Sequence, residues 1–316
     1  MKALILGGTG FIGRHLTKAL LETRHEVAVF HRGKRRVRFP RRVLHIHGNR
    51  SRLKESARSF ASFSPDVVVD LIAFTEADAE SAVQVFGGRV ERVVCASSMD
   101  VYQAYGAFLR LEISKPRLRL LSEDSSLRTT LFPYRALAKN ENDMLFDYEK
   151  ILVERTIMNS SAFSATVLRL PQVFGPHDSQ HRLRDYLQQM DAGKDIAISQ
   201  AKARWRWTRG YVEDIAAGLA LAVTHSKASG RIYNIGEKEA ESESDWIQRI
   251  GKAAGWNGQL RIESEETLPN EPSASYDWNH HLAGDTARIR RELGYRETVA
   301  PEEAMERSVR WECTQT

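Results

Sequence analysis

The strongest constraint on how this chain can fold is a run of glycines directly after its first apolar segment. Residues 2–6 run into Gly7-Gly8-Thr9-Gly10-Phe11-Ile12-Gly13, and an amphipathic helical pattern follows. The GxxGxxG spacing permits a tight strand-to-helix turn and lets the backbone approach a pyrophosphate. The start of the helix adds unpaired N–H groups and a positive dipole end. The run therefore predicts a dinucleotide-binding turn, with cofactor contacts from Gly7, Thr9, Gly10, Phe11, Ile12 and Gly13.

Short apolar runs alternate with helical patterns over the first hundred residues, which is typical of a βαβ chain with a parallel sheet. We expect strands at residues 2–6, 26–30, 43–47, 66–72 and 92–97, and helices at 11–22, 51–60 and 76–86. Several apolar runs are continuous rather than alternating, as in strands covered on both faces. The fold class is therefore α/β, an NAD(P)-binding Rossmann fold with a doubly wound parallel sheet.

The second half of the chain predicts a smaller lobe beside that sheet. Residues 99–142 show little periodicity, which indicates a functional loop or lid, and a helix at 143–159 and a strand at 165–170 follow. We assign residues 1–170 to the Rossmann domain, with 205–235 returning to it, and 171–204 and 236–316 to a C-terminal α/β substrate lobe. Ligands of open α/β sheets bind at the carboxyl edge of the strands, which this lobe would cover.

Composition excludes several classes of protein. The 316 residues are 42% hydrophobic and 28% charged, which is a globular composition. The two cysteines, Cys95 and Cys313, lie too far apart in sequence to suggest a disulfide framework or a zinc site, and no carboxylate completes a metal set with the histidine pairs at 45/47 and 280/281. The opening apolar run is too short for a signal peptide and nothing approaches a membrane span, so we expect a cytoplasmic protein with no metal.

The net charge of +5 has a local origin. Seven of the 46 Lys and Arg residues lie between Arg32 and Arg42 with no acid among them, which leaves 39 basic residues against 41 acidic ones elsewhere. The bulk of the chain is therefore slightly acidic, and a single segment attracts anions.

The position of this basic segment favours NADP over NAD. In dinucleotide-binding folds an acid at the end of the second strand holds the adenosine ribose and would repel a 2′-phosphate. Here the strand leads into His31-Arg32-Gly33-Lys34 without an acid, and we expect His31 and Arg32 to contact the cofactor. A solvated basic loop and an RNA-binding patch are the alternative interpretations of the same residues.

Taken together, the order and spacing of several short motifs resemble the extended short-chain dehydrogenases/reductases of the NAD-dependent epimerase/dehydratase family. Beyond the glycine run, the motifs are Gly48-Asn49-Arg50, Cys95-Ala96-Ser97-Ser98-Met99-Asp100-Val101-Tyr102, residues 168–176 (LRLPQVFGP), residues 211–216 (YVEDIA), Tyr233-Asn234-Ile235-Gly236 and Leu293-Gly294-Tyr295.

The resemblance implies a hydroxyl residue, a tyrosine and a lysine acting together. A tyrosine serves as acid or base near neutrality only if its phenolate is stabilised, which an ammonium does in this family. Ser98, four residues before Tyr102, matches the family's hydroxyl residue, and Lys150, followed by Glu154, matches its lysine. The expected cofactor contacts implied by the resemblance are Asn49, Arg50, Leu71, Ala73 and Lys150.

The tyrosine is where this sequence departs from the family. The family spacing is YxxxK, and Phe146 stands in the tyrosine's place. Tyr148 is our candidate acid/base, although on a regular helix it would point about 200° away from Lys150. Three solutions stay open: an irregular first turn brings Tyr148 to the site, the acid comes from a tyrosine of the long loop, or the fold binds cofactor without this chemistry. The loop tyrosines are Tyr102, Tyr105 and Tyr134.

The function we expect is an NADP(H)-binding oxidoreductase, epimerase or dehydratase acting on a carbinol or ketone of a small polar substrate, such as a sugar or nucleotide sugar. Candidate ligands for substrate anions are Arg182, Arg204 and Arg209, the last two flanking a stretch in which cations and aromatics alternate. The alternative is a non-catalytic NADP-binding regulator or RNA-binding protein on the same fold. The resemblance also implies a homodimer built partly on the helix that carries Lys150.

Overall fold

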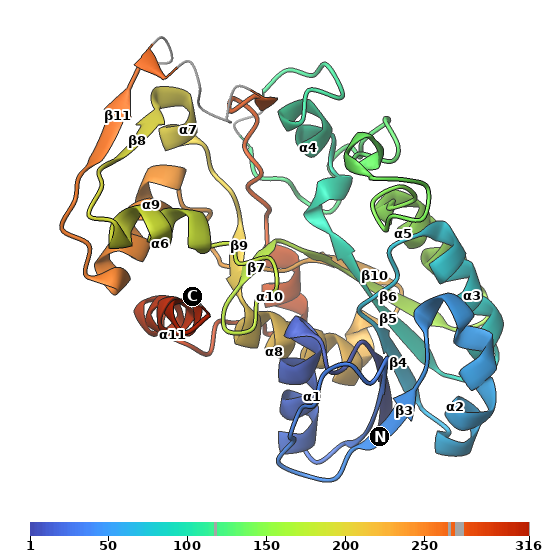
Figure 1. Cartoon of the computed structure of the whole chain (residues 1–316). Helices are drawn as coiled ribbons and strands as arrows, with labels where there is room; N and C mark the ends of the chain where they lie inside the picture. Colours follow the sequence, from blue (N-terminus) through green and yellow to red (C-terminus); the bar gives the residue numbers. More distant parts are fainter. Residues whose placement is uncertain (117–118, 265–266, 269–274, 316) are drawn as a thin grey trace.

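The computed structural model describes residues 1–116, 119–264, 267–268 and 275–315. At its centre is a seven-stranded sheet in the order β10-β6-β5-β4-β1-β2-β3, in which every neighbouring pair is parallel (Figure 1). The expected doubly wound sheet is confirmed. The strands are β1 (Lys2–Leu6), β2 (Glu26–His31), β3 (Leu44–His47), β4 (Val67–Asp70), β5 (Arg92–Ser98), β6 (Ser164–Leu170) and β10 (Arg231–Asn234).

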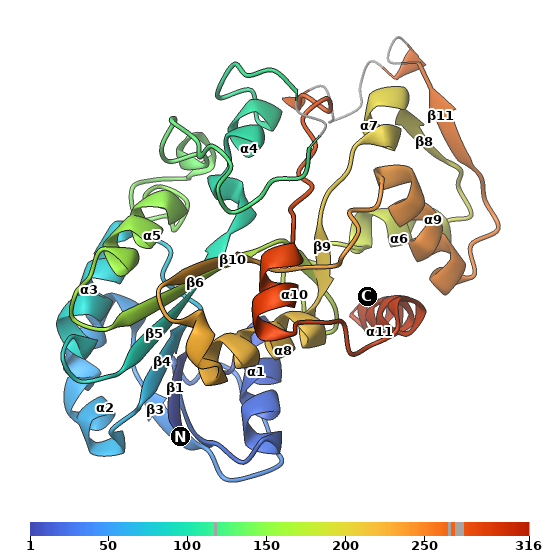
Figure 2. The same cartoon turned by 180° about the vertical axis from the view of Figure 1, so that it is seen from behind.

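Alternate residues of the central strands enter two separate cores, one on each face of the sheet. Ala3 and Ile5 of β1 pack with helices α1 and α8, whereas Leu4 and Leu6 pack with α2, α3 and α5. Because both faces are covered, consecutive residues in the middle of the central strands are apolar, which explains their continuous hydrophobic runs. Figure 2 shows the two helical layers from behind. These helices are α1 (Phe11–Glu22), α2 (Ala57–Phe63), α3 (Glu76–Phe86), α5 (Lys150–Met158) and α8 (Val212–Thr224).

A second lobe lies beside the carboxyl ends of the strands. It contains the parallel pair β8–β11 and the helices α6, α7, α9 and α11, while the parallel pair β7–β9 joins it to the sheet. Helix α10 packs against β10 rather than within the lobe. Among the described residues, none of the helices has the length and apolarity needed to cross a bilayer. The bounds are β7 (Gln172–Phe174), α6 (Arg184–Asp191), β8 (Ile196–Ser199), α7 (Gln200–Arg204), β9 (Arg209–Tyr211), α9 (Glu243–Ala254), β11 (Leu260–Glu263), α10 (Ala287–Leu293) and α11 (Pro301–Cys313).

The shorter elements connect these layers. The helix expected at 51–60 is instead a 3-10 segment, η1 (Arg50–Ser56), followed by α2, and the non-helical backbone angles of Arg52 kink η1 itself. The aperiodic segment 99–142 contains little regular structure and crosses the carboxyl edge of the sheet near α4 (Figure 1). Its elements are η2 (Met99–Val101), α4 (Gln103–Phe108) and η3 (Arg135–Leu137), and η4 (Ser226–Ala228) follows α8.

The helix predicted at 143–159 is wrong at its beginning, because α5 starts only at Lys150. Residues 143–146 instead form a separate turn, in which the Asp143 carboxylate accepts the Leu145 N–H and the Asp143 carbonyl accepts the Phe146 N–H. The apolar spacing of this stretch resembled a helical stripe, but local side-chain bonds to the backbone competed with the helix.

Glu149 sets the start of α5. Its backbone is extended (φ −157°, ψ 100°), its N–H donates to the Phe74 carbonyl, and its carboxylate accepts the Ile151 N–H as an N-terminal cap. The same carboxylate accepts the Phe132 N–H and two bonds from Arg128, and both charged side chains are fully buried. The pair therefore ties the long loop to the first residue of the helix.

Replacing Glu149 by Gln should lower the free energy of unfolding by about 3–5 kcal/mol, because it leaves the Arg128 guanidinium buried without its counter-charge. Urea denaturation measures the change. The control is Asp147→Asn, which removes a largely exposed pair with Arg135 and should lower the free energy of unfolding by less than about 1 kcal/mol. Equal losses in the two variants would contradict the role given to the buried pair.

Candidate active site

The glycine run forms the turn between β1 and α1. Gly7 has φ +89°, and the Gly10 N–H donates to its carbonyl at 2.9 Å. A Cβ on Gly13 would lie 2.2 Å from the Gly7 carbonyl oxygen, so only glycine lets the helix pack this closely on the turn. No side chain caps the helix at Gly10, and its first N–H groups are available to an anion, as expected of this segment.

At the end of β2, His31 and Arg32 have different environments. The His31 ring accepts the Gly33 N–H through Nδ1 and lies 2.9 Å from Nδ1 of His45 through Nε2. Burial and the neighbouring histidines His47 and His45 lower the pKa of His31 to about 4, so the ring is neutral near neutrality. Arg32 is exposed, as are the other Lys and Arg side chains up to Arg42, and no ion pair of Arg32 is found among the described residues.

The other predicted cofactor contacts lie around the next strand ends. Asn49 caps η1 by accepting the Ser51 N–H, and Leu71 donates its N–H to the Leu6 carbonyl beside the glycine turn. Arg50 is engaged by protein, since its guanidinium binds the buried Asp70 carboxylate at 2.7 Å. Ala73 is buried and its carbonyl accepts a bond from Lys150.

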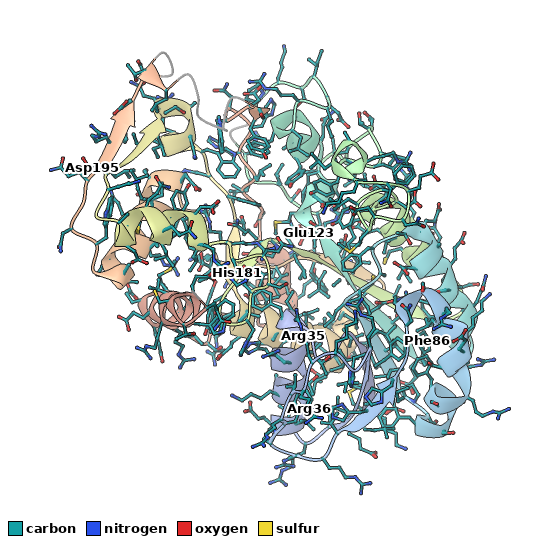
Figure 3. All side chains as sticks on the ribbon, in the orientation of Figure 1. Arg35, Arg36, Phe86, Glu123, His181 and Asp195 are labelled. Carbon is teal, nitrogen blue, oxygen red and sulfur yellow. The ribbon has the colours of Figure 1, made fainter. Side chains whose placement is uncertain are left out.

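Sequence reasoning missed a group of arginine and histidine side chains beside the glycine turn. Burial, and then the charge of Arg35, lower the pKa of Arg14, whose buried Nε has no partner among the described residues. Burial lowers the pKa of His177, and the charges of Arg14 and Arg35 lower it further. Arg35 lies near the N-terminal end of α1 (Figure 3). His15 has its pKa lowered to about 4, mainly by burial. The positive charge of this region therefore comes from Arg14 and Arg35, while the Glu213 carboxylate lies 4.0 Å from the His15 ring.

A pocket of about 530 Å³ opens at the carboxyl edge of the sheet, between the long loop and the second lobe. Ser98, the last residue of β5, lines this pocket, and so do Leu170 and Gln172 from the β6–β7 junction. Arg182 and Trp207 line it from the second lobe. Its size suits a small organic ligand. The remaining walls are formed by Phe74, Met99, Asp100, Tyr105, Leu121, Tyr134, Met144, Leu145, Tyr148, Pro171, Gln180 and Leu282.

Ser98 and Tyr148 meet in this pocket, because Tyr148 lies in the extended segment before α5. Its hydroxyl donates to Oδ2 of Asp100 at 2.8 Å. Burial raises the pKa of Tyr148 well above its ordinary value; the Asp100 carboxylate raises it further, and a hydrogen bond with Ser98 lowers it. The geometric objection to Tyr148, which assumed a regular helix through it, is therefore wrong.

Asp100, to which the sequence assigned no role, is a central group of the pocket. It lies in η2, two residues after Ser98, and is 4% exposed. Its Oδ2 accepts the hydroxyls of Tyr148 and Tyr134, whereas its buried Oδ1 has no partner in the part of the chain that the structure describes. Burial raises the pKa of Asp100. The available sequence signal was an acid directly after a buried strand.

The remaining aromatic candidates differ in position. Tyr134 and Tyr105 reach the pocket, and their hydroxyls lie 2.9 Å apart. Tyr102 is turned into the core, where its hydroxyl bonds Asn234 and Arg169. Phe146, which stands where the family has tyrosine, packs under the Arg135 guanidinium outside the pocket.

Lys150 is the first residue of α5 and is buried beside the pocket. Its Nζ donates to the carbonyls of Ala73 at 2.6 Å and Ala96 at 2.9 Å, which occupies two of the three donors of an ammonium. Burial lowers its pKa, against the opposing effect of nearby acidic groups. It lies 5.9 Å from the centroid of the Tyr148 ring, and among the described residues no hydrogen bond joins its ammonium to the Tyr148 hydroxyl.

The three candidate substrate arginines occupy three different environments. Arg182 lines the pocket and pairs with the buried Asp178 at 2.7 Å. Arg209 is 2% exposed and binds Glu243, and it reaches the pocket only through Gln172, whose side chain it holds at 3.1 Å. Arg204 is exposed at the end of α7, away from the pocket lining.

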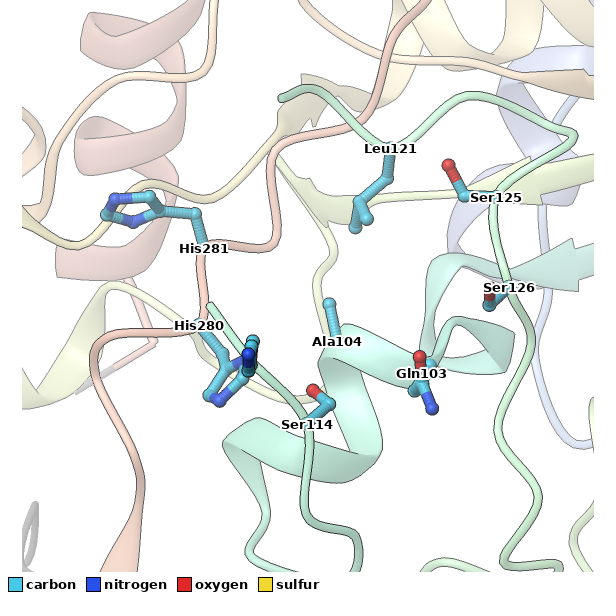
Figure 4. A pocket seen from close by; sticks show the side chains of 9 residues that line it. Gln103, Ala104, Ser114, Leu121, Ser125, Ser126, His280 and His281 are labelled. Atoms are coloured by element: carbon cyan, nitrogen blue, oxygen red, sulfur yellow. The ribbon is translucent and has the colours of Figure 1, made fainter. Parts of the chain in front are cut away.

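A second hollow adjoins the first behind Leu121, between α4, the loop that follows it and His280-His281 (Figure 4). Its enclosed space of about 20 Å³ holds roughly one water molecule, too little for a substrate. His281 accepts the Arg206 N–H, and His280 lies near Asp277. Within the described ranges, no group of three or more His, Cys, Asp or Glu side chains is arranged to hold a metal ion.

Comparison with known proteins places this geometry in context. A family model described as "NAD dependent epimerase/dehydratase family" matches residues 3–107 and 138–236. Those ranges include the glycine turn, Ser98, Tyr148 and Lys150.

Two curated relatives are similar along most of the chain. The chloroplast stem-loop binding protein of 41 kDa b of Arabidopsis thaliana is 22% identical over 268 residues, which are 81% of this chain and 64% of that protein. The chain thus spans less than two thirds of that relative's length. The 2′-dehydrokanamycin reductase of Streptomyces kanamyceticus is 23% identical over 310 residues, covering 95% of this chain and 79% of the reductase.

The solved structures agree on the fold. The UDP-glucose 4-epimerase of Thermus thermophilus, in complex with NAD, superposes with a TM-score of 0.70 at 20% identity, covering 100% of both chains.

Proposed function

Since the chain belongs to the NAD-dependent epimerase/dehydratase family, we propose that it binds NADP(H) and oxidises or reduces a carbinol or ketone carbon, as an epimerase, dehydratase or reductase. The observation that carries the proposal is the meeting of Ser98 and Tyr148 in a pocket at the carboxyl edge of the sheet. Two hydroxyls at that edge are what a carbinol oxygen needs for orientation and proton transfer.

The residues present fit a dinucleotide. The close approach of Gly13 to Gly7 leaves a cradle that a Cβ would fill, and the uncapped start of α1 offers N–H groups to the pyrophosphate. Asn49, Leu71 and Ala73, at the ends of the neighbouring strands, are the further residues that we propose to contact the dinucleotide. Lys150 keeps one donor for a ribose hydroxyl. When bound, the nicotinamide supplies the acceptor or donor of hydride.

The chain's own residues then orient the substrate and move its proton. Ser98 holds the substrate oxygen, and the neutral hydroxyl of Tyr148 exchanges a proton with it. Phe74, Leu170 and Pro171 form an apolar wall that excludes water from this region of the pocket.

Two observations support NADP rather than NAD. The end of β2 has no acid to hold the ribose hydroxyls and carries the exposed Arg32. Arg14 and Arg35 add positive charge at the adjoining start of α1, and the buried Nε of Arg14 has no partner among the described residues. A 2′-phosphate would supply an anionic partner for these arginines.

A sugar-like substrate is the proposed class. Two relatives act, by name, on a nucleotide sugar and an aminoglycoside ketone, and both compounds are polar and cyclic. Arg182 and Gln172 are the polar groups that enter the pocket from the second lobe, Arg209 fixes the Gln172 side chain, and Arg204 lies at the outer border. We propose a homodimer as the assembly, built partly on α5, the helix that carries Lys150, as the resemblance implies.

A second function, binding of RNA, rests on one relative and one surface. The Arabidopsis relative is named for stem-loop binding. All seven Lys and Arg residues between Arg32 and Arg42 are exposed, and in the described part of the chain they form no ion pair. Such a segment suits a phosphate backbone.

Cofactor preference tests the proposed NADP site. NADPH should bind more tightly than NADH in a fluorescence titration, and Arg32→Ala or Arg14→Ala should weaken NADPH about tenfold or more while leaving NADH nearly unchanged, because each removes a charge-assisted contact to the phosphate. Gly13→Ala should abolish binding of both nucleotides. Gly255→Ala, in the second lobe, is the control: its φ of +68° strains an alanine although the space around it is open, so we expect it to lower the stability of the protein without changing the binding of either nucleotide. Tighter binding of NADH by the wild type would contradict the NADP assignment.

Turnover tests the role of Tyr148. NADPH oxidation is followed with a panel of sugar and nucleotide-sugar ketones, and Tyr148→Phe should lower turnover about 100-fold or more without changing the Kd for NADPH. Tyr102→Phe is the control, because its hydroxyl bonds Asn234 in the core. A Tyr148→Phe enzyme with wild-type turnover would exclude this tyrosine as the acid.

Salt-dependent binding separates the second function from the first. RNA binding would require affinity for a stem-loop oligonucleotide that falls steeply between about 50 and 200 mM salt. It would also be lost when Arg35, Arg36, Arg38, Arg41 and Arg42 are replaced by Gln, and it would persist in Tyr148→Phe. We expect NADPH to displace any RNA bound at this segment, because Arg35 borders the cofactor site. RNA binding unaffected by NADPH, with no turnover on any ketone, would favour the second function.

A further inference from the structure

The Asp100 carboxylate stands where it can exchange a proton with Tyr148. Asp100 lies in η2, directly after β5, and lines the pocket; its Oδ2 accepts the Tyr148 hydroxyl at 2.8 Å and the Tyr134 hydroxyl at 3.1 Å. Oδ1 is buried and has no partner among the described residues. A buried carboxylate with one free oxygen is unfavourable as an anion, so this group binds a proton more readily than an exposed acid does.

The lysine near the phenol is occupied elsewhere. Two donors of the Lys150 ammonium are bound to the Ala73 and Ala96 carbonyls. The Tyr148 hydroxyl therefore faces a carboxylate rather than a cation, and a carboxylate disfavours the phenolate. A mechanism in which Tyr148 first ionises and then acts as a base does not fit this arrangement.

We propose that Tyr148 is a proton relay and that Asp100 is the group that stores the proton. This rests on the proposed oxidoreductase function. In the oxidative direction the substrate hydroxyl gives its proton to Oη of Tyr148, while the original Tyr148 proton passes to Oδ2 of Asp100. The carbinol C–H breaks with its electron pair, which leaves as hydride to the oxidised nicotinamide cofactor, and the carbonyl forms. In the reductive direction neutral Asp100 returns the proton along the same path.

The groups that face Asp100 support this role. Arg128 donates through Nε to the Asp100 backbone carbonyl, and its charge and that of Lys150 lower the pKa of the carboxyl, opposing the larger effect of burial. The hydrogen bonds from Tyr148 and Tyr134 lower it as well, and Tyr105 adjoins through Tyr134. The balance keeps the pKa of the carboxyl above its ordinary value, so the group can change charge at a pH at which the protein is folded. Asp100 does not reach the substrate itself, because both of its oxygens are buried or covered, and it acts through Tyr148.

The decisive experiment is an infrared titration of the full chain without ligand. Subtracting the Asp100→Asn spectrum from that of the wild type isolates the carbonyl band of neutral Asp100. We expect its midpoint to lie above the range of ordinary carboxyls and to rise by about one pH unit in Tyr148→Phe, because that variant removes a hydrogen bond to the ionised form. Tyr102→Phe, which alters a phenol outside this network, should leave it unchanged.

A midpoint in the ordinary carboxyl range, or one unmoved by Tyr148→Phe, would overturn the relay. If Asp100→Asn does not fold, the difference between wild type and Tyr148→Phe still shows whether one carboxyl responds to this phenol. NADPH binding is measured on the same samples, so the two proposals fail separately. If the wild-type protein does not bind NADPH, the proposed function is rejected, while the infrared result still stands for the Tyr148–Asp100 pair. If it binds NADPH and turns over a ketone, but Tyr148→Phe leaves the infrared midpoint unchanged, the relay alone is rejected.

The pH dependence of turnover is a second test. If Asp100 only stabilised the fold, replacing it would not change this pH dependence. Oxidation requires ionised Asp100, so kcat for the carbinol partner of any ketone reduced in the NADPH assay should rise with pH through the infrared midpoint. Reduction requires neutral Asp100, so kcat in that direction should fall across the same interval. In Asp100→Asn both dependences should flatten and kcat should fall about 100-fold, with a smaller change in KM. Asp147→Asn, one residue from Tyr148 but exposed, should keep the wild-type profile.

Discussion

The buried ion pair between Arg128 and Glu149 is the interaction on which the site depends. Neither side chain is exposed, and the Glu149 carboxylate also accepts the N–H groups of Phe132 and Ile151. A buried charge is stable only when its hydrogen-bonding groups all have partners, so Arg128, Phe132 and Ile151 must keep their positions around the Glu149 carboxylate. It holds the long loop against the start of α5 and makes the helix begin at Lys150, which leaves Tyr148 in extended chain facing the pocket.

A second buried pair supports the other side of the same edge. Arg169 of β6 binds Glu154 of α5 at 2.7 Å, and Glu154 also accepts the hydroxyl of Ser97 on β5. The strand that ends in Ser98 and the helix that begins at Lys150 are thus joined below the pocket. Because the strand and the helix are fixed, the hydroxyls of Ser98 and Tyr148 keep their relative positions. The two buried ion pairs that fix them, Arg128–Glu149 and Arg169–Glu154, do not line the pocket.

The sequence predicted the fold well because its evidence was periodic and local. The strands of the first half lie within two residues of expectation, and the family resemblance is confirmed by a model that covers both halves of the Rossmann domain. The start of α5 could not be predicted in this way. The apolar spacing through Leu145 and Tyr148 is the same whether the stretch is helical or not. The position at which the helix begins depends on the ion pair of Glu149 with Arg128, which lies 21 residues away in sequence. The role of Asp100 was hidden for the same reason, because its partners come from the long loop and from the segment before α5.

The replacement of tyrosine by Phe146 therefore changes less of the site than the sequence suggests. A tyrosine two residues later reaches the pocket because the helix starts late, but it arrives beside a carboxylate instead of an ammonium. This exchange reverses the electrostatics of the phenol: a neighbouring cation favours phenolate, whereas Asp100 favours the neutral hydroxyl. In the relay that we propose, the acid/base property belongs to the pair and not to the tyrosine alone, since a proton that leaves Tyr148 has a buried acceptor 2.8 Å away. On that proposal, the late start of α5, which brings Tyr148 into the pocket, also replaces the family's YxxxK pair with a Tyr148–Asp100 pair.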